Sequence, residues 1–316
     1  MQFIGSVVCP VRGRLRGWSV SISAYSLSLV SCALVALVAL QSPASAASRE
    51  YRLEQHAMWS ASLGHEVGYR VALPPGYGAP ENRDRRYPVI YLLHGLKGSS
   101  WDWFHIGRLH QTLAKRLGSG EMSEVIAVSM NGGGSYWTRE IDRVDRPGQD
   151  YARFVAVDVL AEIDRKFRTL RRRQYRSLVG LSMGGFGALS LGLLYPDRFG
   201  SVVSLSGALF REVPGSKAAY RAVWGDPPQS AHFERYSPFA LANRVEMSQV
   251  LPRIYIGCGR SDHRSFRERS AAMHERLTSR QISHLYQEGQ GAHNWSYWVG
   301  DSEGWLSFAQ AGFSHP

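Results

Sequence analysis

The chain has 316 residues, of which 44% are hydrophobic and 11% aromatic; this is enough for one large or two small domains and excludes a disordered chain. Its formal net charge is +11, and cations gather between Arg165 and Arg173. We interpret this basic segment as a helix end and the turn after it, because cations there favour the helix dipole and no nucleic-acid-binding motif accompanies it. Nucleic acid is therefore not an expected partner.

The first 46 residues have the pattern of a secretory signal peptide. Three arginines precede an apolar stretch over residues 27–40, and Ala44-Ser45-Ala46 provides an A-x-A cleavage pattern. A stretch of 14 residues is short for a membrane span. We predict cleavage after Ala46 and an exported mature protein, periplasmic or extracellular, with no membrane span. Removal of three arginines and no acid lowers the charge from +11 to about +8.

Two alternatives to cleavage remain open. The stretch could stay uncleaved as an anchor, or Leu29-Val30-Ser31-Cys32 could act as a bacterial lipoprotein box with a lipid on Cys32. The apolar run continues beyond Cys32, whereas such a box normally closes the run, so lipidation is the less favoured alternative. With Cys9 and Cys32 removed, Cys258 has no disulfide partner and is expected to pack as a small buried hydrophobe.

From Glu66 onward, apolar runs rich in β-branched and aromatic residues alternate with longer helical patterns. This alternation is typical of a mostly parallel sheet with crossover helices on both faces, the α/β class. Most expected strands are continuous apolar runs, such as Val89-Ile90-Tyr91-Leu92-Leu93, as doubly buried strands should be. We predict strands near 67–73, 88–93, 124–130, 176–181, 200–206, 252–258 and 283–287, and helices near 106–117, 150–167, 183–195, 264–279 and 302–312.

The alternation lapses between Ser206 and Pro252, where proline, glycine and aromatic residues are frequent, as in Trp224-Gly225-Asp226-Pro227-Pro228. Because this segment follows a strand, it leaves the carboxyl edge of the sheet, where open α/β folds bind ligands. A long irregular insert in a compact domain is usually functional. We predict that residues 207–250 form an irregular cap or pocket wall within a single domain over residues 47–316.

Gly180-Leu181-Ser182-Met183-Gly184 joins a strand pattern to a glycine-rich helical pattern. A tight strand-to-helix turn of this G-x-S-x-G type is a nucleophile elbow, which exposes the serine hydroxyl. The two outer glycines stand where side chains would crowd the turn. The pattern predicts Ser182 as the nucleophile of a serine hydrolase, which then needs a base, an acid and oxyanion donors.

The acid and the base are expected after the serine, because on this fold the chain order runs serine, acid, histidine. Asp262 follows the carboxyl end of a predicted strand, where the orienting acid is expected. The competing acids are Asp197 in an exposed helix end, Asp226 in the insert, Glu234 and Glu288.

His293 is the predicted base because it follows the last strand in a glycine-rich loop, Gly289-Gln290-Gly291-Ala292-His293, that lets the ring bend toward the serine. His274 falls within a helix pattern and His284 within a strand pattern, which favours structural roles. His263 directly follows Asp262 and would point elsewhere.

Two backbone donors are expected for the oxyanion. One is the N–H after the nucleophile, which is Met183, and the other comes from the loop after an early strand. In Leu93-His94-Gly95-Leu96-Lys97-Gly98, Gly95 lets the backbone turn and Leu96 is the expected donor. His94 precedes the serine in the chain, which favours an orienting or structural role. Aromatic residues that could line an acyl or aryl pocket, if they are not plain core, are Trp101, Trp103, Tyr136, Trp224 and Trp295.

Several further motifs accompany the elbow along residues 60–312. They are Leu92-Leu93-His94-Gly95, Tyr195-Pro196-Asp197-Arg198-Phe199, Ser204-Leu205-Ser206-Gly207, Gly259-Arg260-Ser261-Asp262 and His293-Asn294-Trp295-Ser296-Tyr297-Trp298. Together with the elbow they resemble the esterase D family of α/β-hydrolases, which includes S-formylglutathione hydrolases, feruloyl and acetyl-xylan esterases, and mycolyltransferases. The resemblance implies an α/β-hydrolase fold with Ser182, His293 and Asp262 as the triad and Leu96 with Met183 as oxyanion donors.

The expected function is that of a secreted serine carboxylesterase acting on a small-molecule or carbohydrate-linked ester, with no metal or cofactor required. An alternative is a mycolyltransferase-type enzyme that passes the acyl group to a sugar hydroxyl, although such enzymes commonly have an aspartate in place of His94. A third interpretation, from a different class, is a non-catalytic envelope-binding protein that has kept the fold. The sequence specifies neither the ester nor the oligomeric state.

Overall fold

The computed structural model of the chain describes residues 50–142, 147–215, 217–300 and 302–313. The predicted signal peptide and the possible lipid anchor on Cys32 lie outside these residues. Within them, no helix is both long and apolar enough to cross a membrane.

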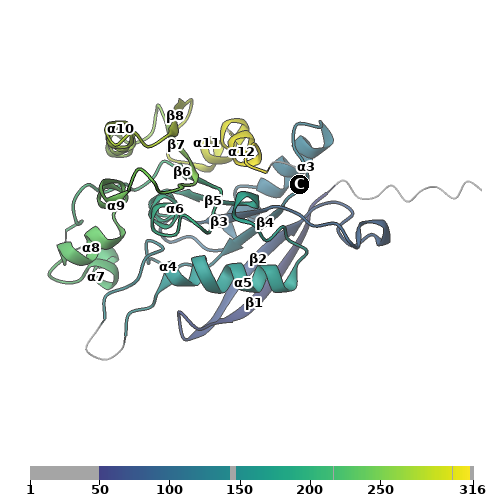
Figure 1. Cartoon of the computed structure of the whole chain (residues 1–316), viewed down its shortest axis with the longest axis horizontal. Coiled ribbons are helices and arrows are strands. Elements are labelled where there is room, and N and C mark those ends of the chain that lie inside the picture. The colour runs from purple at the N-terminus through teal and green to yellow at the C-terminus, as the bar shows by residue number, and fades with distance from the viewer. Residues whose placement is uncertain (1–49, 143–146, 216, 301, 314–316) are drawn as a thin grey trace, which may run out of the picture. The chain divides into compact units, whose positions relative to one another are not determined.

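An eight-stranded sheet forms the centre of the described part, in the order β1-β2-β4-β3-β5-β6-β7-β8 (Figure 1). β2 pairs antiparallel with β1 and with β4, and every other pair is parallel, so the expected mostly parallel α/β sheet is confirmed. The strands are β1 (Arg52–Ser60), β2 (His65–Leu73), β3 (Val89–Leu93), β4 (Ile126–Met130), β5 (Arg176–Leu181), β6 (Ser201–Leu205), β7 (Arg253–Gly259) and β8 (His284–Gly289).

Among the strands of the described residues, β1 alone was not predicted from the sequence. Its residues are mostly polar and about half of its positions are exposed, because it pairs with β2 alone at the edge of the sheet. An edge strand of this kind lacks the continuous apolar run by which the buried strands were found.

Alternate side chains of the central strands enter two separate cores, one on each face of the sheet. Val89, Tyr91 and Leu93 belong to one core, whereas Ile90 and Leu92 belong to the other. The first core is completed by α5 (Leu160–Lys166), α6 (Met183–Leu194) and α10 (Arg264–Ser279), and the second by α2 (Asp102–His105), α3 (Leu109–Gly118), α11 (Trp295–Gly300) and α12 (Ser302–Gln310). The helices therefore cover both faces, as predicted.

Three predicted helices differ in detail. The helix expected over 106–117 is α3, which begins only at Leu109 because Arg108 before it has a left-handed backbone with φ 51°; the short α2 ahead of it was not predicted. The helix expected over 150–167 is α4 (Tyr151–Arg153), a π-helical segment over Phe154–Val159 (η2) and then α5. The last helix ends at Gln310, and α11 before it was not predicted. Two single 3-10 turns, η1 (Pro80–Asn82) and η3 (Arg173–Tyr175), complete the list.

The insert over 207–250 is not irregular, which corrects the prediction. It holds three short helices, α7 (Ala218–Trp224), α8 (Ser230–Tyr236) and α9 (Pro238–Arg244). α9 packs against α6 and α10, and the buried aromatic side chains of the insert join the core on that face. These helices were not predicted because each has only seven residues, and the prolines and glycines between them interrupt the helical pattern in the sequence.

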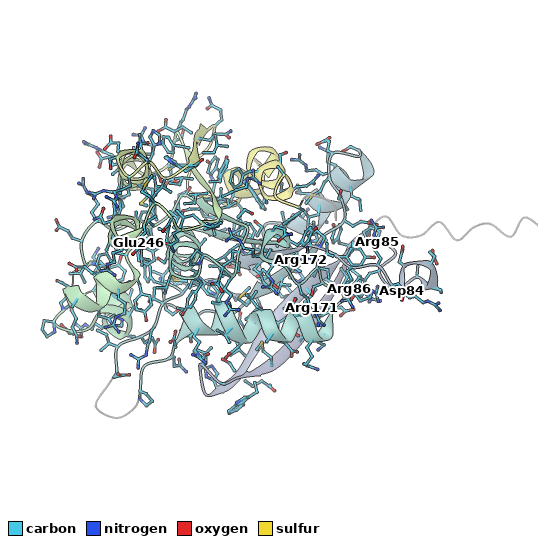
Figure 2. All side chains as sticks on the ribbon, viewed as in Figure 1. Asp84, Arg85, Arg86, Arg171, Arg172 and Glu246 are labelled. Carbon is cyan, nitrogen blue, oxygen red and sulfur yellow. The ribbon has the colours of Figure 1, made fainter. Side chains whose placement is uncertain are left out.

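The basic segment lies at the amino ends of the parallel strands. α5 ends at Lys166, β5 begins at Arg176, and Arg171 and Arg172 line a surface pocket there together with Arg86 (Figure 2). Since Ser182 follows the carboxyl end of β5, the arginines and the serine lie at opposite edges of the sheet.

Candidate active site

Ser182 lies in a strained turn between β5 and α6. Its backbone has φ 54° and ψ −115°, which is rare for any residue other than glycine. The Ser182 N–H donates to the carbonyl of Leu205 and its own carbonyl accepts from the N–H of Ala208, both at 2.9 Å. The strained conformation is thus held by hydrogen bonds to the end of β6 and to the chain that follows it.

Backbone contacts leave no room for a side chain at the two glycines that flank Ser182 in the elbow. A Cβ on Gly180 would lie 2.0 Å from the carbonyl oxygen of Gly184, and one on Gly184 would lie 2.3 Å from that of Leu93. These atoms cannot move aside as a flexible side chain could. The G-x-S-x-G spacing is therefore a steric requirement of the turn.

The fold brings Ser182, His293 and Asp262 together from three separate loops. His293 Nε2 lies 3.0 Å from Ser182 Oγ, and His293 Nδ1 lies 3.1 Å from both Oδ1 and Oδ2 of Asp262. Because a carboxylate can only accept, Nδ1 carries the hydrogen and donates it. Nε2 is then left as an acceptor for the hydroxyl of Ser182.

The carboxylate of Asp262 is buried, with 0% of its side chain exposed. Burial by itself raises the pKa of this group, but hydrogen bonds from His293 and Ser206 and from the N–H of His263 outweigh burial and lower the pKa below its usual value. The His263 N–H donates to Oδ1 at 2.6 Å. Asp262 therefore stays ionised beside the imidazole. Cys258 is also buried here, 3.9 Å from Oδ2, and burial raises its pKa to about 12.

Two aromatic rings hold the imidazole of His293. Phe266 stacks on it at 4.1 Å between centroids and 30° between planes, and Trp298 meets it edge-on at 4.9 Å. Trp298 also donates its Nε1–H to Ser206 Oγ at 3.1 Å, and Ser206 in turn hydrogen-bonds Asp262. Ser206 and Trp298 stood in motifs that carried the family resemblance, but the sequence assigned them no role; Phe266 lay in no motif.

The predicted oxyanion donors lie beside Ser182. Met183 is the first residue of α6, so its N–H has no partner within the helix. A Cβ built on Gly95 would lie 3.5 Å from Cβ of Ser182, which places the loop of Leu96 against the nucleophile. Within the described residues, the Leu96 N–H donates to no backbone carbonyl. Two N–H groups next to the serine are thus available to an oxygen atom.

His94 holds the loop of Leu96 in place. The N–H of Gly132 donates to His94 Nε2 at 3.0 Å, so the hydrogen is on Nδ1, which donates to the carbonyl of Gly95 at 2.7 Å. The ring is fully buried, and burial lowers its pKa and keeps it neutral. This geometry agrees with the orienting or structural role expected for His94.

The five aromatic residues proposed for a substrate pocket occupy different places. Trp103 is plain core, fully buried on the second face of the sheet, 5.4 Å from Trp295. Tyr136 and Trp224 pack together at 5.9 Å in a buried cluster beneath the insert, with 3% and 0% exposed. Trp295 is half-buried next to Trp298, at 5.5 Å. Trp101 is exposed and stacks on His105.

Comparison with known proteins agrees with this geometry. The family model described as "Putative esterase" matches residues 60–301. This chain belongs to that esterase family. It is therefore a carboxylesterase, an enzyme that acts on carboxylic ester bonds, with the α/β-hydrolase fold.

Individual relatives are more distant. An acetyl esterase from Caldicellulosiruptor saccharolyticus is 26% identical over 234 residues, which cover 69% of this chain and 83% of that protein. An endo-1,4-beta-xylanase/feruloyl esterase from Xylanibacter ruminicola is 28% identical over 52% of this chain and 23% of its own length. Among solved structures, a ferulic acid esterase superposes with a TM-score of 0.71 at 24% identity, covering 84% of this chain and 99% of its own.

Proposed function

We propose that Ser182 is the nucleophile of this esterase, His293 its general base and Asp262 the acid that orients the base. The observation that carries the proposal is the continuous hydrogen-bonded path from Asp262 through His293 to Ser182, with separations of 3.1 and 3.0 Å. The rival histidines have other partners. His274 and His284 bond each other at 2.8 Å, and His263 caps the start of α10.

The first half of the reaction acylates the serine. Ser182 Oγ attacks the ester carbonyl carbon while its proton passes to His293 Nε2. The carbonyl oxygen becomes an oxyanion, which the N–H groups of Leu96 and Met183 stabilise. When the tetrahedral intermediate collapses, the bond to the alcohol oxygen breaks, and His293 gives its proton to that oxygen. The alcohol leaves and an acyl-serine remains.

The second half releases the acid. Water attacks the acyl carbon while His293 takes a proton from it, and the same N–H groups hold the new oxyanion. The bond to Ser182 Oγ then breaks and His293 returns the proton to the serine. Throughout, Asp262 keeps the ring oriented and stabilises the imidazolium that forms twice in each cycle. The lowered pKa of Asp262 supports this role, because a neutral acid would give no charge stabilisation.

For the substrate we propose an acetyl or hydroxycinnamoyl ester of a carbohydrate. The support is the acetyl esterase and feruloyl esterase names of the relatives, together with the aromatic rings of Phe266 and Trp298 against His293. A panel of acetylated and feruloylated sugars and of 4-nitrophenyl esters with increasing acyl length would identify the acyl group that gives the highest kcat/KM.

The assignment is tested with purified protein and 4-nitrophenyl acetate. We expect release of 4-nitrophenol by the wild type and no release above background by Ser182→Ala. Activity retained in Ser182→Ala would overturn the assignment of the nucleophile. The same assay with a polyol added separates hydrolysis from transfer: we expect free acid as the main product, whereas acylated polyol as the main product would favour the transferase alternative.

We also propose that the protein is exported and cleaved after Ala46, on the strength of the sequence pattern of residues 1–46. Mass spectrometry of the protein recovered outside the cytoplasm tests this. We expect Ala47 as the first residue. A lipid-modified Cys32 at the N-terminus, or an intact residue 1, would contradict cleavage at this site.

A further inference from the structure

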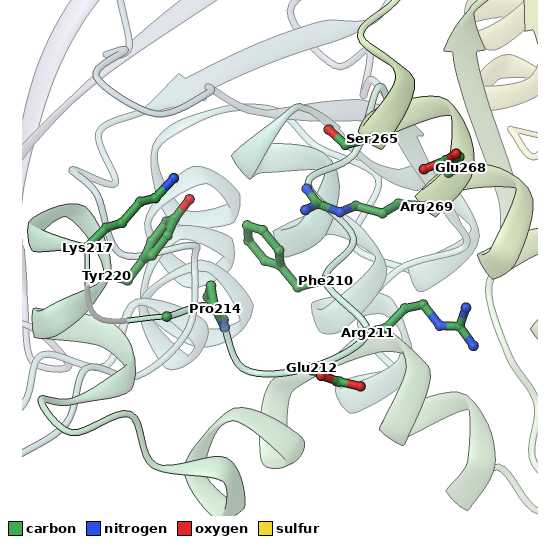
Figure 3. Close-up of a pocket in the computed structure, with 10 residues that line it drawn as sticks. Phe210, Arg211, Glu212, Pro214, Lys217, Tyr220, Ser265, Glu268 and Arg269 are labelled. Carbon is green, nitrogen blue, oxygen red and sulfur yellow. The ribbon is translucent and has the colours of Figure 1, made fainter.

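A pocket of about 580 Å³ opens between the insert and the first turns of α10 (Figure 3). One wall continues to the nucleophile: Ala208 donates to the carbonyl of Ser182, and Phe210, two residues later, lines the pocket. The other wall continues to the base, because Ser265 lines the pocket and its neighbour Phe266 stacks on His293. Both walls of the pocket therefore lie within two residues, along the chain, of groups that contact the triad.

Arg269 is the half-buried cation of this pocket. It lies three residues after Phe266 on α10, so both side chains are on the same helix face, about one turn apart. Its guanidinium carbon lies 4.5 Å from the ring centroid of Phe210. Within the described residues no carboxylate forms an ion pair with Arg269, so its charge is not neutralised there, and the face of Phe210 stabilises the cation.

Lys217 and Tyr220 approach from the opposite wall, with their polar ends directed toward the space beside Phe210 and Arg269 (Figure 3). The hydroxyl of Tyr220 hydrogen-bonds that of Tyr136. The pocket thus presents two cations and a hydroxyl above the apolar ring of Phe210.

Two carboxylates also line the pocket, but neither neutralises this end of it. Glu268 is paired with Arg264 at 2.6 Å. Glu212 lies on the side of Arg211, apart from Arg269 and Lys217 (Figure 3). Arg211 is directed away from the centre of the pocket in the same view. The free charge beside Phe210 is positive.

The part of the substrate that enters this pocket follows from the mechanism. His293 gives its proton to the leaving alcohol, so the alcohol part of the ester must lie on the side of His293. α10, which carries both the stacking partner Phe266 and the cation Arg269, packs on that side. The alcohol part therefore extends along α10.

We propose that this enzyme prefers esters whose alcohol part carries a carboxylate, such as an acylated hydroxy acid or sugar acid, and that Arg269 and Lys217 bind that carboxylate. Arg269 provides a planar donor fork for it, and Phe210 packs against the apolar spacer. The inference rests on the proposed function and adds the class of alcohol to it.

The test compares 4-acetoxyphenylacetate, which is anionic at pH 7, with the neutral ester 4-acetoxyphenylacetamide; each has one carboxylic ester bond, whose hydrolysis releases acetate and a similar phenol. We expect the wild type to prefer the anion by about tenfold in kcat/KM, the order of one charge-assisted hydrogen bond. Arg269→Gln should lower this preference to near one, and Lys217→Gln should lower it in part. Added salt should reduce it as well, because the pocket is open to solvent.

Arg267→Gln is the matched control, since it removes an exposed arginine from the same helix that lines no part of this pocket, and it should leave the preference unchanged. A wild type without preference for the anion, or a preference that survives Arg269→Gln, would overturn the inference. The inference would also be overturned if the enzyme preferred an anionic ester only when the carboxylate is on the acyl part, and if that preference depended on Arg269. Hydrolysis of the neutral ester by Ser182→Ala would instead overturn the proposed function, so the two failures are distinct.

Discussion

The elbow and the insert contact each other, through the hydrogen bond from the Ala208 N–H to the Ser182 carbonyl, but are built differently. At the elbow, backbone atoms confine Gly180 and Gly184, and hydrogen bonds fix the strained Ser182. In the insert, short helices are held by aromatic packing, and the buried Nε1 of Trp224 has no hydrogen-bond partner within the described residues. The chemistry depends on a region with almost no steric freedom. We propose that specificity depends on a region whose shape follows from side-chain packing.

The largest effect should come from the base. We expect His293→Ala to lower kcat by about 10⁴-fold or more, because within the described residues no other base hydrogen-bonds Ser182 Oγ. Steady-state hydrolysis of 4-nitrophenyl acetate measures this. His274→Ala is the control, since that ring bonds His284 instead of the serine. Near wild-type activity in His293→Ala would place the base elsewhere.

The steric confinement of the elbow can be tested by replacing one confined and one unconfined glycine with alanine and comparing the free energies of unfolding. Gly184→Ala drives a Cβ into the carbonyl oxygen of Leu93, so we expect a loss of about 2 kcal/mol or more in the free energy of unfolding. Gly118→Ala, in α3, meets nothing within 4 Å and should be neutral or stabilise by up to about 1 kcal/mol. Urea denaturation compares them. Equal stability of the two variants would contradict a rigid elbow.

Two buried tryptophans extend the comparison. Trp298 donates to Ser206, which supports Asp262, whereas Trp224 donates to no partner in the described part of the chain. We expect Trp298→Phe to cost about 1 kcal/mol more stability than Trp224→Phe, the size of one hydrogen bond, and to lower kcat by about tenfold. Thermal unfolding and kcat with 4-nitrophenyl acetate test both. If Trp224→Phe lowered kcat more than Trp298→Phe, the claim that Trp298 supports the triad through Ser206 would be wrong.

The smallest effect concerns pH. The pKa of Asp262 is lowered in the folded protein, so the unfolded chain binds more protons below the ordinary value of 3.8. Asp262 therefore makes its whole contribution to the free energy of unfolding at pH values well above 3.8. This contribution falls as the pH drops toward the pKa of Asp262 in the folded protein. We expect the stability gap between wild type and Asp262→Asn to narrow between about pH 5 and pH 3. A gap that widens on acidification would mean that burial dominates and raises this pKa.

The predictable part of the molecule is the part in which local sequence dictates geometry. The apolar runs of β3 to β7 and the glycines around Ser182 can each be identified without distant contacts. Chain order and strand ends then pointed to His293 and Asp262, which the fold brings into hydrogen-bonding range.

The features that could not be predicted from the sequence depend on contacts between segments that are distant along the chain. β1 is stabilised by pairing with β2 instead of by an apolar run, and the seven-residue helices of the insert depend on packing against α6 and α10. Ser206 and Trp298 support the triad through side-chain hydrogen bonds across 92 positions of sequence. No local pattern predicts such a bond, and none predicts that Arg269 lies over Phe210.

The central claim is that Ser182 becomes covalently acylated. Incubation of the protein with a fluorophosphonate, followed by peptide mass spectrometry, tests this directly, because such a reagent traps an activated serine. We expect one label per chain on the peptide that contains Ser182, none in Ser182→Ala, and labelling slowed by about 10⁴-fold in His293→Ala. Absence of label in the folded wild type, or a label on another residue, would contradict the account and favour a non-catalytic protein of the same fold.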